Sequence, residues 1–570
     1  MARFTLRKPQ RRFGHTILAA SLAALWLAVS LPSRAFAMPA SSGEGLQEPA
    51  ALSFSLSGRA GTPGLFSATK PFPLLVPADV DSAGRSNGPP SHGLKPKKRT
   101  LRAWLELGAF LTYTTTSYWV RAAFPEDWQF QLNFGVQLQR ILGLQGWRFD
   151  SNVFKLNWTH ALAGGIYYEF ARANHLSWLS SWMMGIISST YWEAVVEWKE
   201  VISINDQIMT GIGSYATGEP WYQLGRYLSY QPGVVYQALS FLNPLVKINR
   251  WLDRHDPADK TDAPQGWHDF TLFAGARQLG RSGEDTQTAA YFGFRTQLGA
   301  LPEYGKPGEV EESVKDTYFS EIALDYAVRD GHADETRFLT KAVTLGIVRQ
   351  NINESLEGYS LTLGIGSSFE YFKKRPLAPY DSNPVSVKTG WDPLLLDEPR
   401  DFTDKLAILN VVGPVLDWTI FRRGLKIRTV LEAYVNFSLV NAYALNAYSV
   451  SHDIVGMKTT VFYYGYYYAY GGTLSGNTEL QWGSFRARAM AGFNAWGSFD
   501  GLDRFQADVT NNAHLSDTRA RYLLGVGWKI PRAPLEVFLN FEGVRRWGRI
   551  QEVCYQDLEK KTYAGLQFSF

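Results

Sequence analysis

Two neighbouring stretches decide the fold: TRARYLLGVGWK (518–529) and PLEVFLNFEGVRRW (534–547). Large apolar residues take every second position in both, namely Tyr522, Leu524, Val526 and Trp528, then Leu535, Val537, Leu539 and Phe541. Successive side chains of a β-strand point to opposite faces, so this alternation predicts two amphipathic strands. The short segment 530–533 between them predicts a tight turn, and the pair therefore predicts an antiparallel hairpin.

The same period of two runs through the second half of the chain, from about residue 265 to 570. The candidate strands are 267–279, 287–300, 317–328, 335–349, 357–373, 403–420, 424–437, 459–474, 478–494, 518–529, 534–547 and 563–570. A water-soluble sandwich alternates as well, but here the polar face carries both signs of charge: Arg295, Arg428, Arg486, Arg488, Arg519, Arg521, Glu321, Asp325, Glu432, Glu536 and Glu542. We therefore predict an α+β protein in which a helical domain precedes a transmembrane antiparallel β-barrel of about twelve strands.

The last residues support the barrel. Gly565-Leu566-Gln567-Phe568-Ser569-Phe570 ends on an aromatic residue with apolar residues at every second position. This resembles the terminal-strand signal of bacterial outer-membrane barrels, which the barrel assembly machinery reads. The resemblance implies that Gly565, Phe568 and Phe570 form an assembly signal and that this machinery is a partner during biogenesis.

Connection lengths favour the same topology. From the fifth strand onward, the connections expected to face outward are long: 374–402, 438–458, 495–517 and 548–562. The returning connections are short: Arg422-Arg423, 475–477 and 530–533. Long loops at one end and short turns at the other are typical of outer-membrane barrels. A run of six tyrosines within 463–470 is interpreted as part of a membrane-interface girdle, with sugar binding as the alternative.

The first residues predict export. A basic start, an apolar run from Ile17 to Leu31 and Ala35-Phe36-Ala37 are typical of a signal peptide, 1–37, cleaved near Ala37. Residues 38–99, rich in Pro, Gly and Ser, predict a disordered linker. The expected location is the outer membrane of a Gram-negative bacterium, with outer-membrane lipid as a partner.

Charge and cysteine usage exclude some classes of function. The predicted signal peptide contains six of the 57 Lys and Arg residues and none of the 53 Asp and Glu residues. The rest of the chain therefore has 57 − 6 = 51 basic and 53 acidic residues, a net charge of −2. This charge gives no electrostatic motive for nucleic-acid binding. Cys554 is the only cysteine, which excludes a disulfide framework and a cysteine-based zinc site.

Between the predicted linker and the first candidate strand, residues 100–255 follow a helical period. The expected helices are 101–120, 159–173, 177–199 and 205–215, followed by pieces from 222 to 251 broken at Pro232 and Pro244. His160, Gly164 and Arg172 fall on one side of their helix, and Glu193, Glu197 and Glu200 share one side of the next.

Several short motifs lie within this helical segment. They are Asn157-x-x-His160, Gly164, Tyr167, Arg172-x-Asn174, Ser188, Trp192-Glu193-x-x-x-Glu197, Ser203-Ile204-Asn205-Asp206, Thr210 and Gly218-Glu219. Over about 157–219 the chain resembles the domain-of-unknown-function 3943 family of bacterial outer-membrane proteins. Ala161 and Ile202 stand where the family tends to have proline. The resemblance implies no established activity.

If the helices pack together, His160, Arg172, Glu193, Glu197 and Asp206 converge in one polar pocket. Three uses are open. His160 with Glu193 and Glu197 is a possible divalent-metal site, although no cofactor is predicted outright. His160 with Glu197 or Asp206 is a possible catalytic pair for hydrolysing an envelope lipid, with Ser203 as nucleophile or, more simply, as a helix cap.

The third use is structural. In it, Arg172 neutralises Glu193 and Glu197 in a buried network that Asn157, Glu200, Ser203, Asn205 and Glu219 complete. No H-E-x-x-H or G-x-S-x-G signature favours an enzyme. The leading hypothesis is a non-enzymatic protein that gates passage or binds a lipid or protein partner. Its helical domain is expected to plug the barrel or to cap it from the periplasm.

Overall fold

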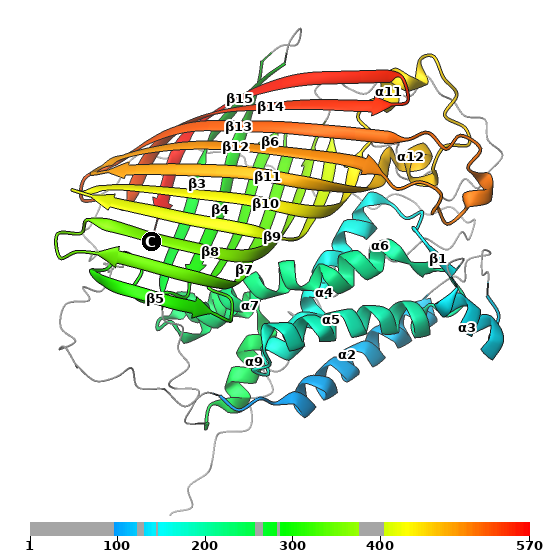
Figure 1. The fold of residues 1–570 in the computed structure, drawn as a ribbon, viewed down its shortest axis with the longest axis horizontal. Coiled ribbons are helices and arrows are strands. Elements are labelled where there is room, and N and C mark those ends of the chain that lie inside the picture. Colours follow the sequence, from blue (N-terminus) through cyan, green and yellow to red (C-terminus); the bar gives the residue numbers. More distant parts are fainter. Residues whose placement is uncertain are drawn as a thin grey trace, which may run out of the picture.

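The computed structural model describes residues 96–121, 130–143, 146–256, 266–281, 286–375 and 404–569. The predicted signal peptide, nearly all of the predicted linker, most of the connection 374–402 and Phe570 lie outside these residues. Within them, helices occupy the first part of the chain and strands the second (Figure 1).

The helical domain begins at Thr100 and ends at Asp253. Its α-helices are α2 (Thr100–Arg121), α3 (Phe134–Leu142), α4 (Phe154–Arg172), α5 (Trp178–Tyr191), α6 (Ile204–Asp206), α7 (Ser214–Tyr230), α8 (Val234–Leu239) and α9 (Pro244–Asp253). Two π-helical turns, η2 (Trp192–Val196) and η3 (Gln207–Ile212), extend α5 and α6, and η4 (Ser240–Leu242) follows α8. The short strands β1 (Trp147–Arg148) and β2 (Ile202–Ser203) pair in parallel. Pro244 opens α9, at the break that its position in the sequence predicts.

The strands close into a ring of twelve, which confirms the predicted barrel. In ring order they are β7 (His332–Ile352), β6 (Phe319–Arg329), β4 (Gln287–Gly299), β3 (Trp267–Arg281), β15 (Val553–Ser569), β14 (Leu535–Ile550), β13 (Leu515–Lys529), β12 (Phe485–Ser498), β11 (Tyr466–Trp482), β10 (Leu425–Asn441), β9 (Lys405–Arg422) and β8 (Gly358–Lys374). Neighbours are antiparallel, and β7 pairs with β8 to close the ring. A thirteenth strand, β5 (Gly308–Val314), lies in the connection 301–316 and pairs with β7 beyond the end of β6.

The register of the ring fixes its shape. A row of paired residues leaves β11 at Tyr466, passes once around the barrel and returns to β11 at Trp482, a stagger of 482 − 466 = 16 residues. Twelve strands with this stagger tilt by roughly 45° from the barrel axis, which is usual for membrane barrels.

Three expected details of the strands are wrong. The predicted turn 475–477 lies inside β11, because the connection to β12 is Gly483-Ser484. The predicted outward loop 548–562 contains only the two-residue turn Gln551-Glu552 between β14 and β15. The predicted start of the eighth strand is a helix instead, α12 (Thr459–Tyr464). Tyrosine and valine favour strands, but strand propensities span only about 1 kcal/mol and depend on tertiary context, so the alternating pattern at 459–464 does not fix the structure.

The barrel is apolar outside and charged inside. Trp482, Leu524 and Phe541 point outward and are 66%, 57% and 52% exposed. Inside, Arg337 on β7 binds Glu542 on β14 at 2.7 Å, although at least four strands separate β7 and β14 in either direction around the ring.

Further ion pairs join distant strands across the interior. Lys341 of β7 binds Glu432 of β10 at 2.7 Å, and Arg519 of β13 binds Glu370 of β8 at 2.9 Å. In sequence, charges of both signs on the polar face are compatible with an anion-attracting pore or with internal salt bridges. The structure shows salt bridges across the interior.

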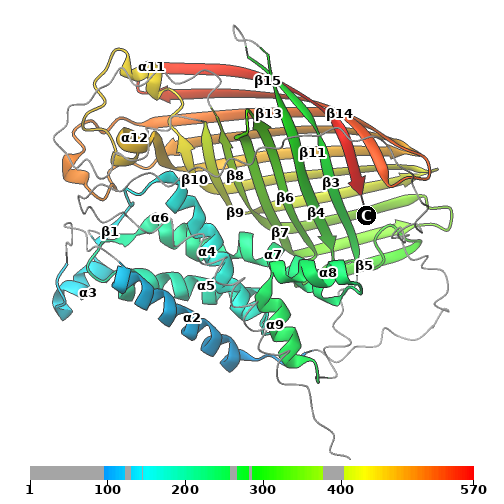
Figure 2. The same cartoon turned by 180° about the vertical axis from the view of Figure 1, so that it is seen from behind.

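The helical domain lies against the outer wall of the barrel, not inside it or across its end (Figures 1 and 2). Phe369 and Phe437 face the same way as the exposed wall residues Ile365 and Val435, yet they are only 0% and 4% exposed. They pack against helical-domain residues in one apolar cluster that includes Phe149, Phe154, Met209, Ala216, Ala407, Leu409 and Leu439.

Helix α7 crosses β9, β8, β7, β6 and β4 on this outer side. The expectations of a plug and of a periplasmic cap are therefore wrong. The physical reason is that the apolar face of the helices matches the apolar outer wall, whereas ion pairs fill the interior.

The tyrosine run is also placed differently from the prediction. Tyr466 and Tyr468 point outward but are covered by the helical domain, and Tyr467 points inward and donates a hydrogen bond to Asp517 at 2.8 Å. Tyr470 is 52% exposed. The girdle interpretation is thus wrong for Tyr466, Tyr467 and Tyr468. Among the described helices, none is both long and apolar enough to cross a membrane.

Candidate functional site

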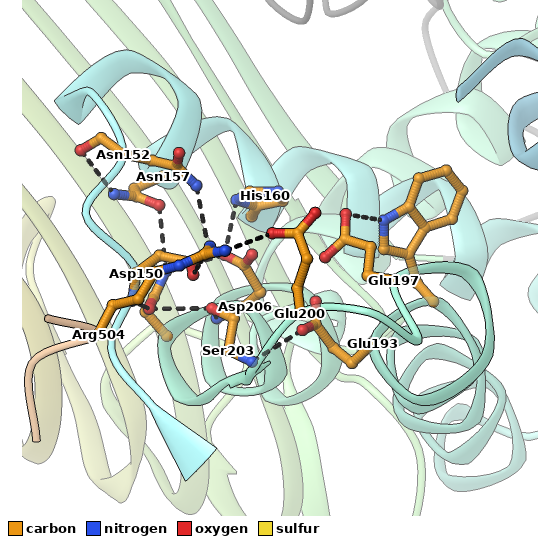
Figure 3. Close-up of polar contacts among 12 residues, drawn as sticks. Asp150, Asn152, Asn157, His160, Glu193, Glu197, Glu200, Ser203, Asp206 and Arg504 are labelled. Atoms are coloured by element: carbon orange, nitrogen blue, oxygen red, sulfur yellow. Dashed lines mark hydrogen bonds and ion pairs between the residues drawn. The ribbon is translucent and has the colours of Figure 1, made fainter. Parts of the chain in front are cut away.

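A histidine–aspartate pair lies at the centre of the predicted site. His160 projects from α4, and its Nδ1 lies 2.9 Å from Oδ1 of Asp206 in α6 (Figure 3). Ser203 caps α6, since its hydroxyl accepts a hydrogen bond from the backbone N–H of Asp206 at 3.2 Å. The cap that the spacing predicts is therefore present. It fixes the position of Asp206 and with it the orientation of the imidazole ring.

Two asparagines connect this pair to the barrel. Asn205 donates to Oδ1 of Asp206 at 2.9 Å and to Oδ1 of Asn157 at 3.1 Å. Asn157 is fully buried and donates to the hydroxyls of Tyr466 and Tyr468 at 2.6 and 2.7 Å. Since both tyrosines belong to β11, one hydrogen-bonded chain joins the barrel wall to His160.

Four further carboxylates lie around the pair, and together with Asp206 we call them the acidic cluster: Asp150, Glu193, Glu197, Glu200 and Asp206. Glu193 accepts a hydrogen bond from the backbone N–H of Ser203 at 2.8 Å, and Glu197 accepts one from Nε1 of Trp192 at 2.9 Å. Glu200 accepts one from the hydroxyl of Tyr118 in α2 at 2.9 Å.

Two arginines that sequence reasoning missed balance this cluster. Arg504, in the connection between β12 and β13, lies 2.8 Å from Glu200 and 3.4 Å from Asp150. Arg140 of α3 is fully buried and donates to the backbone carbonyls of Glu193 and Glu197 at 2.6 and 2.9 Å. Arg504 is 304 residues from Glu200 in sequence, so no local spacing pointed to it.

Burial controls the protonation of the cluster. It raises the pKa of Asp150 to about 7, and the nearby Asp206 carboxylate adds to the effect. It also raises the pKa of Glu193 and Glu197 well above the ordinary value, with neighbouring carboxylates reinforcing it. For His160, burial lowers the pKa, but the carboxylates of Asp206 and Asp150 and a hydrogen bond with the Asn157 backbone together raise it by more, so the net shift is upward.

Arg172 belongs to a different cluster. It binds Glu219 of α7 through two contacts, Nε–Oε2 at 2.8 Å and Nη2–Oε1 at 2.9 Å, and also Asp316 at 2.9 Å. Tyr168 donates to Glu219 at 2.5 Å. Arg172 lies 12 residues beyond His160 on α4, or about 18 Å along the helix axis. The expected single pocket is therefore wrong for Arg172, as is its pairing with Glu193 and Glu197.

The contacts of these side chains form one connected network. The Ser203 hydroxyl donates to Oδ1 of Asn205 at 3.0 Å, and the His160 imidazole lies 2.9 Å from the Asp206 carboxylate. In the described part of the chain, no group of three or more His, Cys, Asp and Glu side chains has a geometry suited to a metal ion.

As a class, the molecule is a closed β-barrel of the outer-membrane type with a helical domain on its outer wall. Residues 146–245 match the family model described as a domain of unknown function, DUF3943, so this part of the chain is a DUF3943 domain, as the motifs predict. No curated protein matches the sequence.

Solved structures resemble the barrel part. One is a loop-deletion mutant of OmpT, an outer-membrane protein of Vibrio cholerae, with 8% identity over 54% of this chain and 99% of that one and a TM-score of 0.22. Another is a mutant of the TodX monoaromatic hydrocarbon channel, with 9% identity over 54% and 90% and a TM-score of 0.20. A Pseudomonas aeruginosa FadL homologue has 9% identity over 53% and 89% and a TM-score of 0.20. Scores this low add nothing to the barrel assignment, which rests on its own strand pairing.

Proposed function

We propose that this is a non-enzymatic outer-membrane protein in which a closed barrel holds the helical domain as a binding module for an envelope lipid or a protein partner. The ion pairs across the barrel interior carry the proposal. Glu542, for example, has three such contacts. It lies 2.7 Å from Arg337, accepts a hydrogen bond from the hydroxyl of Tyr563 at 2.6 Å and also pairs with Arg521. Breaking such buried pairs to open a path costs several kcal/mol for each charge left alone.

The proposed outer-membrane location follows from the apolar outer wall of the barrel. The apolar outer wall is stable only where it contacts lipid or another apolar partner. Export by the predicted signal peptide and assembly through Gly565, Phe568 and Phe570 would bring the barrel to the outer membrane. Fractionation tests this location: the mature chain should remain with the outer membrane after washing with carbonate and dissolve in detergent.

Conductance tests the closed interior. The purified full-length protein in planar bilayers should give no steady single-channel current, whereas a trimeric porin in the same bilayers should. The matched variant is Arg337→Ala combined with Glu542→Ala. It removes the pair between them and also the contacts of Arg337 with Glu335 and of Glu542 with Arg521 and Tyr563, and it leaves the outer wall unchanged. A steady current from the unmodified protein would show that the interior is an open path and would overturn the proposal.

A membrane-embedded hydrolase is the second candidate, because His160 and Asp206 lie 2.9 Å apart. Its test is His160→Gln, which keeps a hydrogen-bonding side chain but removes the base. Unchanged envelope-lipid turnover would exclude a catalytic role for His160, and lost turnover in a correctly folded variant would establish one. Elemental analysis of the purified protein tests the metal alternative at the same site.

A further inference from the structure

The outer side of the helical domain is unusually poor in charge. Of all the Lys, Arg, Asp and Glu side chains described within 100–256, only those of Lys155 and Arg254 are exposed. In the same residues, 22 large apolar side chains are exposed. A domain surrounded by water normally carries charges on roughly a quarter to a third of its surface. This side of the domain therefore does not have the surface of a water-soluble one.

The exposed apolar residues form continuous faces on α2 and α5. On α5, Leu179, Met183 and Ile187 repeat every four residues and are 48%, 45% and 47% exposed. On α2, the exposed large residues run from Leu101 to Val120. In Figures 1 and 2, α2 lies on the side of the helical domain away from the barrel, and α5 lies between α2 and α4. Because the side chains of these two faces are exposed, neither face holds the domain to the barrel.

Three exposed hydroxyls on these faces are hydrogen-bonded to carbonyls of their own helices. Thr112 and Thr116 donate to the carbonyls of Gly108 and Thr112 at 2.7 and 2.8 Å, and Thr190 of α5 donates to Ile186 at 2.9 Å. Hydrocarbon offers no hydrogen-bond partner, so exposed hydroxyls there must bond internally. Among the described charged side chains of α2, Arg102 turns inward and binds Asp253 of α9 at 2.6 Å.

The domain also lies at the level of the exposed apolar part of the barrel wall. It covers wall residues such as Phe369 and Phe437, and the open wall directly beside them exposes Ile365 and Val435 at 47% and 60%. The covered and lipid-facing parts of the wall are thus continuous along the same strands.

We infer that the helical domain is immersed in the bilayer beside the barrel, with the outer faces of α2 and α5 in contact with lipid acyl chains. The domain and the barrel then share one lipid boundary. The two exposed charges mark its edges, since Lys155 begins α4 and Arg254 follows α9 at the opposite end of the domain. The acidic cluster lies at the Lys155 end, where Arg504 reaches it from a barrel connection. The inference rests on the proposed outer-membrane location.

Cysteine labelling in native outer membranes tests it. In a Cys554→Ala background, single cysteines replace Met183, Ile187, Lys155 or Arg254, and Leu524→Cys on β13 serves as the lipid-facing barrel control. Maleimide reacts with the thiolate, which forms only in water. Cysteines at 183 and 187 should react with a water-soluble maleimide at least tenfold more slowly than those at 155 and 254, and as slowly as that at 524.

Lipid quenching separates contact with acyl chains from burial by protein. A bimane attached in detergent at 183 or 187 should be quenched by brominated lipid after reconstitution, to the same degree as at 524. If 183 and 187 react like 155 while 524 stays protected, the domain lies in water and the inference fails, although the barrel remains a membrane protein. If 524 also reacts freely, the proposed outer-membrane location fails as well. Protection at 183 and 187 without quenching would show a protein partner on these faces and would also overturn the inference.

Discussion

The contact between Asn157 and the barrel tyrosines gives the sharpest prediction for how the two parts hold together. Asn157→Ala removes the bonds to the hydroxyls of Tyr466 and Tyr468 at 2.6 and 2.7 Å and the bond from Asn205 at 3.1 Å. It also removes a longer contact with the carbonyl of Asn152 at 3.3 Å, which shares the two Nδ2 hydrogens with the tyrosines and is not counted separately. Two of the partners keep another bond: Tyr466 still donates to the carbonyl of Asn152 at 2.5 Å, and Asn205 still donates to Asp206. Tyr468 loses its donor within a buried site.

The expected cost follows from this count. Each net hydrogen bond contributes about 1 kcal/mol, so losing three should destabilise the docking of α4 by about 3 kcal/mol. That free energy corresponds to roughly a hundredfold change in an equilibrium constant. Tyr468→Phe removes a single one of these bonds and keeps the ring against Phe149, at a centroid distance of 4.8 Å, and should cost about 1 kcal/mol. The double variant should cost about 1 kcal/mol less than the sum, because the two changes remove the same bond.

Hydrogen exchange by mass spectrometry measures this directly. Peptides from α4 should exchange roughly a hundredfold faster in Asn157→Ala than in the parent protein, while peptides from β12 to β14 stay unchanged. Asn133→Ala is the matched control, since Asn133 is exposed and caps α3 away from the barrel, so its effect should stay within α3. Unaltered exchange in α4 would refute the reasoning, and so would equal acceleration in α4 and the barrel strands.

Three further predictions concern the other buried charges. Arg172→Ala should destabilise the helical domain by about 3–5 kcal/mol in urea unfolding, because Glu219 is fully buried and loses its partner; a loss below about 1 kcal/mol contradicts this. The domain should lose stability between about pH 4 and pH 7, because the raised pKa of Asp150, about 7, gives a stabilisation that is complete below about pH 4 and lost as the carboxyl ionises. Asp150→Asn should flatten this part of the pH profile of helical-domain unfolding, and a slope that persists counts against the assignment. Glu542→Ala should lower the thermal midpoint of the barrel and leave exchange in α4 unchanged, since Glu542 pairs with Arg337 inside the barrel; a loss of protection in α4 alone would oppose it.

The predicted site was found only in part, for reasons that differ between residues. Ser203 and Asp206 are three residues apart, and their cap depends on local backbone geometry, so spacing alone predicts it. The motifs place His160 and Asp206 in the same family segment, but only the packing of α4 on α6 brings the two side chains together. Arg172 was assigned to the wrong carboxylates, because a helix period shows which residues share a side and not which neighbour that side meets.

By itself, the sequence determined the class of fold. Alternation with a period of two is a local property of each strand, and a charged face opposite an apolar face already requires a wet interior and a lipid-facing exterior. Only the tertiary structure decided where the helices lie. The helical domain is apolar on more than one side, so its sequence is compatible with a plug, a cap or a position on the wall. The ion pairs that Arg337, Lys341 and Arg519 make across the interior leave the outer wall as the apolar surface against which α4 and α7 pack.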